Sequence, residues 1–195
     1  MGTTGIILAG GRSSRMGEEK ALLEGVGETL IEHAIKTLTP LCTEIVISTN
    51  RPDLFRAFHL ATIGDLTPDL GPLSGIASAL GRSETDVNIV IAVDMPGIVT
   101  DFLSYLLDCF PGQSGVVPVS DTGILQPLCG VYSASLVPAI EKLLNNNRLA
   151  AAAITDLPGV LKLAVTPHTP GYSKEMFANL NTPADMEKWK LANRH

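Results

Sequence analysis

The sequence predicts an α/β fold of three layers, in which a mostly parallel sheet carries helices on both faces. Short runs rich in Ile and Val alternate with longer stretches in which apolar residues recur at helical spacing. The short runs are apolar at consecutive positions, which is typical of strands buried on both faces. With 195 residues, 45% of them hydrophobic and 17% charged, the chain suits a single domain over residues 1–195.

The first half of the chain repeats a strand and helix pattern. We expect strands at residues 5–9, 44–48 and 88–93. Between the first two, apolar residues at spacings of three and four predict a helix over 30–38, with Thr29 as its cap. Two more helices are expected at residues 73–80 and 101–110. This alternation indicates parallel strands joined by crossover helices.

The second half departs from this regularity. A strand at 115–119 is followed by the turn residues 121–123 and an apolar stretch at 125–132, which predicts a small antiparallel excursion. Helices are expected at 135–144 and from 149 to 154. A last helix is expected over 183–191, with Pro183 in its first turn and Thr182 as its cap.

Composition excludes several classes of function. The formal net charge is −6, from 14 Lys and Arg against 20 Asp and Glu, which is the wrong sign for binding nucleic acid through its phosphates. No apolar run reaches the length of a membrane span, and the N-terminus lacks the pattern of a signal peptide. The three cysteines form neither a metal motif nor a disulfide framework. We therefore expect a cytoplasmic protein that binds neither nucleic acid nor membranes.

The loop after the first strand is the densest chemical feature. Gly10 and Gly11 allow backbone N–H groups to approach an anion, and Arg15 and Lys20 add positive charge nearby. The loop lacks both GxGxxG and GxxxxGK[ST], so neither a dinucleotide-binding fold nor a P-loop is supported. A plain glycine turn beside a solvated basic loop is the alternative. The pattern favours a triphosphate site.

Asp94 ends the apolar strand at 88–93. Ligands of open α/β sheets lie beyond the carboxyl ends of the strands, so Asp94 and the Gly10-Gly11 loop can share a crevice and a Mg²⁺ ion. The alternative is that Asp94 only caps the following turn. Pairing with the basic loop favours the metal.

Two further segments join an extended run to the start of a helix. Asp65 precedes the Gly71–Gly75 segment, and its carboxylate can accept hydrogen bonds from a base, while the helix start can face the ligand. The second is Asn179–Pro183. Taken alone, both are better explained by the turn chemistry of Gly-Pro and Asn-Thr-Pro.

Together these motifs resemble the molybdenum cofactor guanylyltransferases, whose fold is nucleotide-diphospho-sugar transferase-like and Rossmann-like. The motifs appear in the family's order over nearly the whole chain: Leu8-Ala9-Gly10-Gly11, Arg15-Met16-Gly17, Lys20, Asp65, Gly71-Pro72-Leu73-Ser74-Gly75, Asp94-Met95-Pro96, Gln126-Pro127-Leu128 and Asn179-Leu180-Asn181-Thr182-Pro183. The ordered set is far more specific than any one motif.

The resemblance implies transfer of GMP from Mg·GTP to the terminal phosphate of molybdopterin carrying molybdenum, with release of pyrophosphate. It implies catalytic roles for Lys20, Arg15 and Asp94, with Asp94 holding Mg²⁺. The residues implied in nucleotide binding are Leu8, Ala9, Gly10, Gly11, Lys20, Ser48, Asp65, Gly71, Pro72, Leu73 and Asp94. On the pterin side it implies Gln126, Arg148, Asn179 and Asn181.

Two positions depart from the family pattern. Where the second strand of the family ends in a nucleotide-contacting Asn, this chain has Ser48, with Asn50 two residues later as a substitute. An alanine-rich stretch follows Arg148, where the family tends to carry a further basic residue.

Three alternatives stay open. A cytidylyltransferase of the same pathway is disfavoured by Gly10 and by Gly71-Pro72-Leu73, and a sugar-phosphate nucleotidyltransferase is usually longer. A non-catalytic nucleotide-binding protein is disfavoured because Lys20 and Asp94 are both present. The expected partners are GTP and molybdopterin, with transient handover complexes with upstream cofactor-biosynthesis proteins and molybdoenzyme chaperones.

Overall fold

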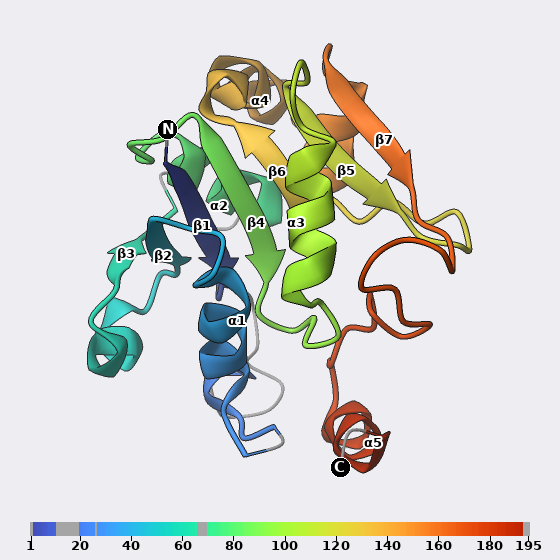
Figure 1. Cartoon of the computed structure of the whole chain (residues 1–195). Coiled ribbons are helices and arrows are strands. Elements are labelled where there is room, and N and C mark those ends of the chain that lie inside the picture. The colour runs from blue at the N-terminus through green and yellow to red at the C-terminus, as the bar shows by residue number, and fades with distance from the viewer. Residues whose placement is uncertain (1, 11–19, 26, 66–69, 193–195) are drawn as a thin grey trace.

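The computed structural model describes residues 2–10, 20–25, 27–65 and 70–192, which fold around one seven-stranded sheet (Figure 1). The strands are β1 (Thr3–Leu8), β2 (Glu44–Ser48), β3 (Ala61–Ile63), β4 (Val87–Ala92), β5 (Gly115–Val119), β6 (Cys129–Ser133) and β7 (Val160–Ala164). They lie in the order β3-β2-β1-β4-β6-β5-β7. Every neighbouring pair is parallel except the two that contain β6. The expected mostly parallel sheet is confirmed, and β6 is its antiparallel excursion.

The turn at residues 121–123 leads toward β6 as predicted, with Gly123 in the left-handed region at φ 82°. The strand itself begins only at Cys129. Pro127 has no N–H to donate to a strand ladder, and the Gln126 N–H donates instead to Pro118 O at 2.9 Å. Regular pairing with β4 therefore starts after this turn.

The α-helices of the described residues are α1 (Leu30–Leu38), α2 (Pro72–Leu80), α3 (Thr100–Asp108), α4 (Val137–Asn145) and α5 (Pro183–Ala192). The cap predicted for α1 is confirmed as a reciprocal capping box. The Glu32 N–H donates to Thr29 Oγ1 at 3.4 Å, and the Thr29 N–H donates to Glu32 Oε2 at 2.8 Å. None of the helices in these described ranges is long and apolar enough to cross a bilayer.

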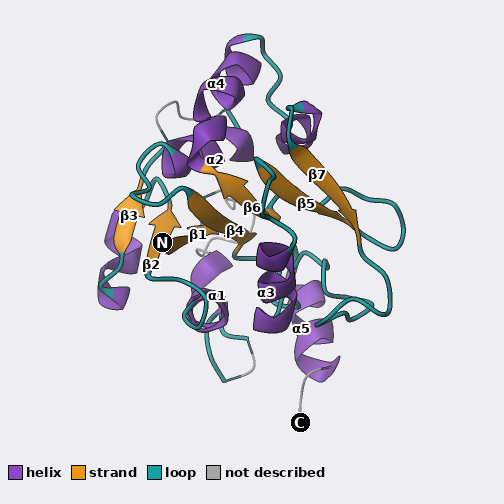
Figure 2. Cartoon of the chain, turned by 45° about the horizontal axis from the view of Figure 1, so that its top comes forward, coloured by secondary structure: helices purple, strands orange, loops and turns teal. Residues whose placement is uncertain are grey.

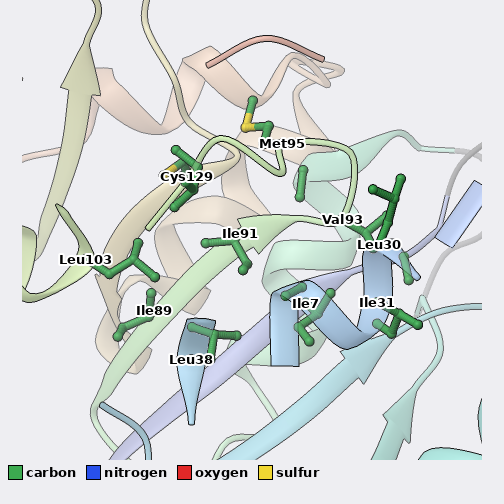
Figure 3. Packing of buried hydrophobic residues seen from close by; sticks show 14 of the residues in the cluster. Ile7, Leu30, Ile31, Leu38, Ile89, Ile91, Val93, Met95, Leu103 and Cys129 are labelled. Carbon is green, nitrogen blue, oxygen red and sulfur yellow. The ribbon is translucent and has the colours of Figure 1, made fainter. Parts of the chain in front are cut away.

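Helices cover both faces of the sheet, as expected (Figure 2). On β1, Ile7 points toward the layer of α1 and α3, whereas Ile6 and Leu8 point toward α2 and α4. Figure 3 shows the first of these two cores, in which Ile7, Ile89 and Ile91 of the sheet meet Leu30, Ile31 and Leu38 of α1. Consecutive apolar residues in the strands thus fill two separate cores.

Several elements differ from the sequence-based expectation. The strands β3 and β7 and the 3-10 helix η2 (Pro52–Phe58) were not predicted. β3 has only three residues, and β7 is a partly exposed edge strand with Lys162 in its middle, so neither forms an apolar run. The helix expected from residue 149 is a 3-10 helix, η4 (Ala151–Asp156), and the helix expected at 135–144 begins with another, η3 (Ala134–Leu136).

Candidate active site

Ser48, Asp65 and Asp94 lie at or just beyond the ends of β2, β3 and β4, and these strands share one carboxyl edge of the sheet with β1 (Figure 1). Backbone hydrogen bonds continue beyond those ends. The Ala9 N–H donates to Ser48 O at 2.9 Å, and the Val93 N–H donates to Leu8 O at 3.1 Å. The loops therefore start side by side, where ligands bind in open α/β sheets.

Lys20, Asp94 and Asn181 meet at this edge. Lys20 Nζ donates to Asp94 Oδ2 at 2.8 Å and to Asn181 Oδ1 at 2.9 Å. Lys20 starts the short 3-10 helix η1 (Lys20–Leu22), Asp94 follows β4, and Asn181 precedes α5. The side chains of Lys20 and Asp94 are 11% and 23% exposed, so the ion pair is largely shielded from water. Three residues predicted from separate motifs thus form one cluster.

The backbone around Asn181 is fixed on both sides. The Leu180 N–H donates to Asp94 O at 2.9 Å. The Asp185 carboxylate accepts from the N–H groups of Asn181 at 3.1 Å and Thr182 at 2.8 Å. The Asp185 N–H donates in return to Thr182 Oγ1 at 3.1 Å, which confirms the predicted cap of α5. Hydrogen bonding to Thr182, first through its side chain, lowers the pKa of Asp185.

Asp185 was not among the predicted site residues. The Thr182–Asp185 spacing matches a capping box and could have identified it.

A second cluster surrounds Asp65. Its N–H donates to Asn50 Oδ1 at 2.9 Å, and Asn50 Nδ2 donates to Asp65 Oδ2 at 3.0 Å. Gly75 lies beside it, because a Cβ there would be 3.2 Å from Asp65 Oδ1 and 3.3 Å from Ser48 Oγ. Ser48 is buried, whereas Asn50 is exposed next to Asp65. The family pattern has an Asn at the end of the second strand; here Asn50, two residues beyond Ser48, is the amide that contacts Asp65.

The start of α2 lies next along this edge. Gly71 precedes the helix in the left-handed region at φ 78°, and Pro72 occupies its first turn. Gly71 has no side chain to cap the helix, Pro72 has no N–H, and the Ser74 N–H donates to Gly71 O at 3.1 Å. The positive end of the helix dipole therefore lies at this edge. Leu73 is fully buried, and Leu8 and Ala9 are nearly so, which leaves their backbones as the groups able to meet a nucleotide.

The residues predicted for the acceptor side do not form a single cluster. Asn179 is exposed two residues before Asn181. Arg148 pairs with Asp156 at 2.5 Å, and the carbonyl of the next residue, Leu149, is 3.8 Å from where a Cβ on Gly71 would lie. Gln126 is 9% exposed, in the turn before β6. Gly11 and Arg15 lie outside the described residues, so their roles stay predictions.

The oxygens that converge on Lys20 are also the kinds that Mg²⁺ prefers. Asp94 offers a carboxylate oxygen and Asn181 an amide oxygen. Within the described residues no group of three or more His, Cys, Asp or Glu could enclose a metal ion. The Asp94 and Asn181 oxygens therefore fit a Mg²⁺ ion as two of its ligands.

The fold of this chain is similar to that of solved protein structures. Molybdopterin-guanine dinucleotide biosynthesis protein A from Archaeoglobus fulgidus is similar over 97% of both chains, with a TM-score of 0.80 and 24% identity. The family model of the MobA-like NTP transferase domain matches residues 5–158. Fold, site and family model together define a nucleotidyltransferase.

Sequence relatives narrow this class. A probable molybdenum cofactor guanylyltransferase of Clostridium perfringens is 35% identical and aligns over 93% of this chain and 92% of its own length. A molybdenum cofactor guanylyltransferase of Syntrophotalea carbinolica is 32% identical over 95% and 89%. The chain belongs to the molybdenum cofactor guanylyltransferase family, as the motifs predicted.

Proposed function

We propose that the protein transfers GMP from Mg·GTP to the terminal phosphate of molybdopterin carrying molybdenum, giving the guanine dinucleotide form and pyrophosphate. The observation that carries this proposal is the placement of Lys20 between Asp94 and Asn181, at 2.8 and 2.9 Å, at the ligand-binding edge of the sheet. Family membership supports the choice of substrates.

For this reaction the protein mainly has to position the two substrates and neutralise the negative charge of their phosphates. The attacking group is a phosphate oxygen that is already anionic, so it needs no general base, and repulsion between phosphates is the main obstacle. The Lys20 ammonium is placed to offset charge on the triphosphate, and Arg15 is proposed to assist. Asp94 and Asn181 would hold Mg²⁺, which supplies further charge neutralisation at the reacting phosphates. The oxygen of the acceptor phosphate then displaces pyrophosphate from the α-phosphorus in line.

Recognition of guanine is assigned to the Asp65 cluster. A carboxylate accepts hydrogen bonds, and the guanine edge offers N–H donors, so Asp65 suits this base. Asn50 orients that carboxylate through the hydrogen bond at 3.0 Å. The start of α2 at Gly71 and Pro72, with the positive end of its helix dipole, completes the nucleotide side.

The acceptor is proposed to approach from the side of Asn179 and Asn181, and Gln126 and Arg148 are proposed to contact it. We further propose a cytoplasmic setting, with transient complexes that deliver molybdopterin and accept the product. Exposed polar side chains such as Asn179 suit a phosphate-bearing pterin better than an apolar ligand.

Titration calorimetry of GTP, CTP and ATP, each with and without Mg²⁺, tests the nucleotide. We expect GTP to bind selectively and more tightly with Mg²⁺. Preference for CTP would move the assignment to a cytidylyltransferase. If none of the three nucleotides binds, the proposal is contradicted.

The Asp94→Asn variant tests the role of the carboxylate with little change of shape. Pyrophosphate release with GTP and molybdopterin should fall by about 10²–10³ or more, the scale of one lost electrostatic stabiliser. Asp108→Asn is the matched control, because Asp108 is an exposed aspartate at the C-terminal end of α3, the helix that runs back from this edge toward the start of β5. Activity of folded Asp94→Asn equal to that of the control would refute the assignment.

A further inference from the structure

In the free protein the Lys20 ammonium lies where a metal ion would be expected. It is within 2.9 Å of both Asp94 Oδ2 and Asn181 Oδ1, and each of these is a ligand type preferred by Mg²⁺. A cation bound to these same two oxygens would overlap the ammonium. Lys20 and a divalent ion therefore compete for one position.

Hydrogen bonds fix the backbone of both residues that carry the two oxygens, while the ammonium can move. The Asp94 carbonyl is tied to the Leu180 N–H at 2.9 Å, and the Asn181 N–H is tied to Asp185 at 3.1 Å. Lys20, in contrast, reaches the site through a flexible four-carbon stem. Its backbone starts η1, next to the fully buried Ala21. The ammonium can thus leave the oxygens without movement of the backbone.

We propose that Lys20 is a placeholder for the divalent cation, and that metal binding displaces its ammonium from Asp94 and Asn181 toward the nucleotide phosphates. This rests on the proposed function. With Lys20 in place the ion pair is neutral. A divalent ion on Asp94 leaves one net positive charge there and frees that of Lys20, so two positive charges face the triphosphate. The metal alone then binds weakly, and metal and nucleotide bind together.

Mn²⁺ binding without nucleotide, measured by electron paramagnetic resonance of the free ion, tests the competition. Replacing Lys20 by Met removes the ammonium and keeps an unbranched stem. We expect Lys20→Met to bind Mn²⁺ at least about tenfold more tightly than the wild type, since the metal no longer breaks a charged hydrogen bond. Lys20→Gln, a polar replacement, should show the same direction if Lys20→Met folds poorly.

Two controls locate the effect. Lys36→Met removes a lysine that pairs with Glu28 at 3.6 Å on the surface, so it tests whether any freed carboxylate attracts Mn²⁺. The Mn²⁺ affinity of Lys36→Met should equal that of the wild type. The double variant Lys20→Met/Asp94→Asn should lose the gain.

Unchanged or weaker Mn²⁺ binding in both Lys20 variants would overturn the proposal, as would a gain that survives loss of the Asp94 carboxylate. These titrations contain no nucleotide. A negative result in the Mn²⁺ titrations therefore contradicts only the competition between Lys20 and the metal. The GTP titration tests the proposed function separately.

Discussion

Gly97 is the position at which a single methyl group should displace the segment that carries Asn181. A Cβ on Gly97 would lie 2.8 Å from Met176 Cα, 2.9 Å from Met176 O and 3.0 Å from Glu175 O. All three atoms belong to the backbone, so no side-chain rotation relieves the contact, and the segment must retreat by about half an ångström. Overpacking of this kind costs about 1–3 kcal/mol. For a chain of this size, Gly97→Ala should therefore lower Tm by roughly 2–12 °C.

Thermal unfolding followed by circular dichroism measures this shift, and a second variant checks its cause. Met176→Ala removes a buried side chain but leaves the backbone atoms that the new methyl would meet. Because that clash involves backbone atoms, Gly97→Ala should still lower the Tm when it is introduced into Met176→Ala, although the two losses need not add for residues in contact. A Tm of Gly97→Ala within about 1 °C of the wild type would refute the reasoning. So would a double variant more stable than Met176→Ala alone.

Two further predictions concern pH and cysteine chemistry. Because hydrogen bonding to Thr182 lowers the pKa of Asp185 in the folded protein, its stabilisation of α5 is present above the ordinary aspartate pKa of about 3.9 and is lost as the pH falls through the lowered value. Fluorescence of Trp189, the single tryptophan, should report this loosening in acid, and Asp185→Asn should be loosened already at pH 7. Burial raises the pKa of Cys42 to about 12, so iodoacetamide at pH 8 should modify Cys42 only after unfolding. Peptide mapping that finds native Cys42 modified as fast as a free thiol would contradict this.

The parallel half of the sheet was predictable because its strands are buried on both faces. Ile6 and Ile7 belong to opposite cores, and such a strand is apolar at every position. β7 has its residues only partly buried at the sheet edge, so its sequence lacks that pattern. Pro127 delays β6 for a local reason that the apolar stretch at 125–132 does not reveal.

Most of the candidate site was predicted from the ends of strands, because a polar residue that follows a buried strand lies at the carboxyl edge of the sheet. Asp94 and Asp65 were found in this way. Ser48 was less informative than Asn50, because the chain runs two residues beyond β2 before an amide reaches Asp65. The pairing of Lys20 with Asn181 spans 161 positions, and no local pattern reports a contact at that separation.

The match to the MobA-like NTP transferase domain ends at residue 158, yet the site does not. Asn181 supplies one of the two oxygens that hold Lys20, and Asp185 fixes the turn that presents it. Without this segment, Asp94 at 2.8 Å would be the one partner of the Lys20 ammonium among the described residues. A metal ion at this position would lose the Asn181 oxygen and keep that of Asp94. The region after residue 158 therefore contributes to the site itself. The backbone hydrogen bond from the Leu180 N–H to Asp94 O ties this region to the residue after β4, so the geometry around the Lys20 ammonium depends on the C-terminal segment.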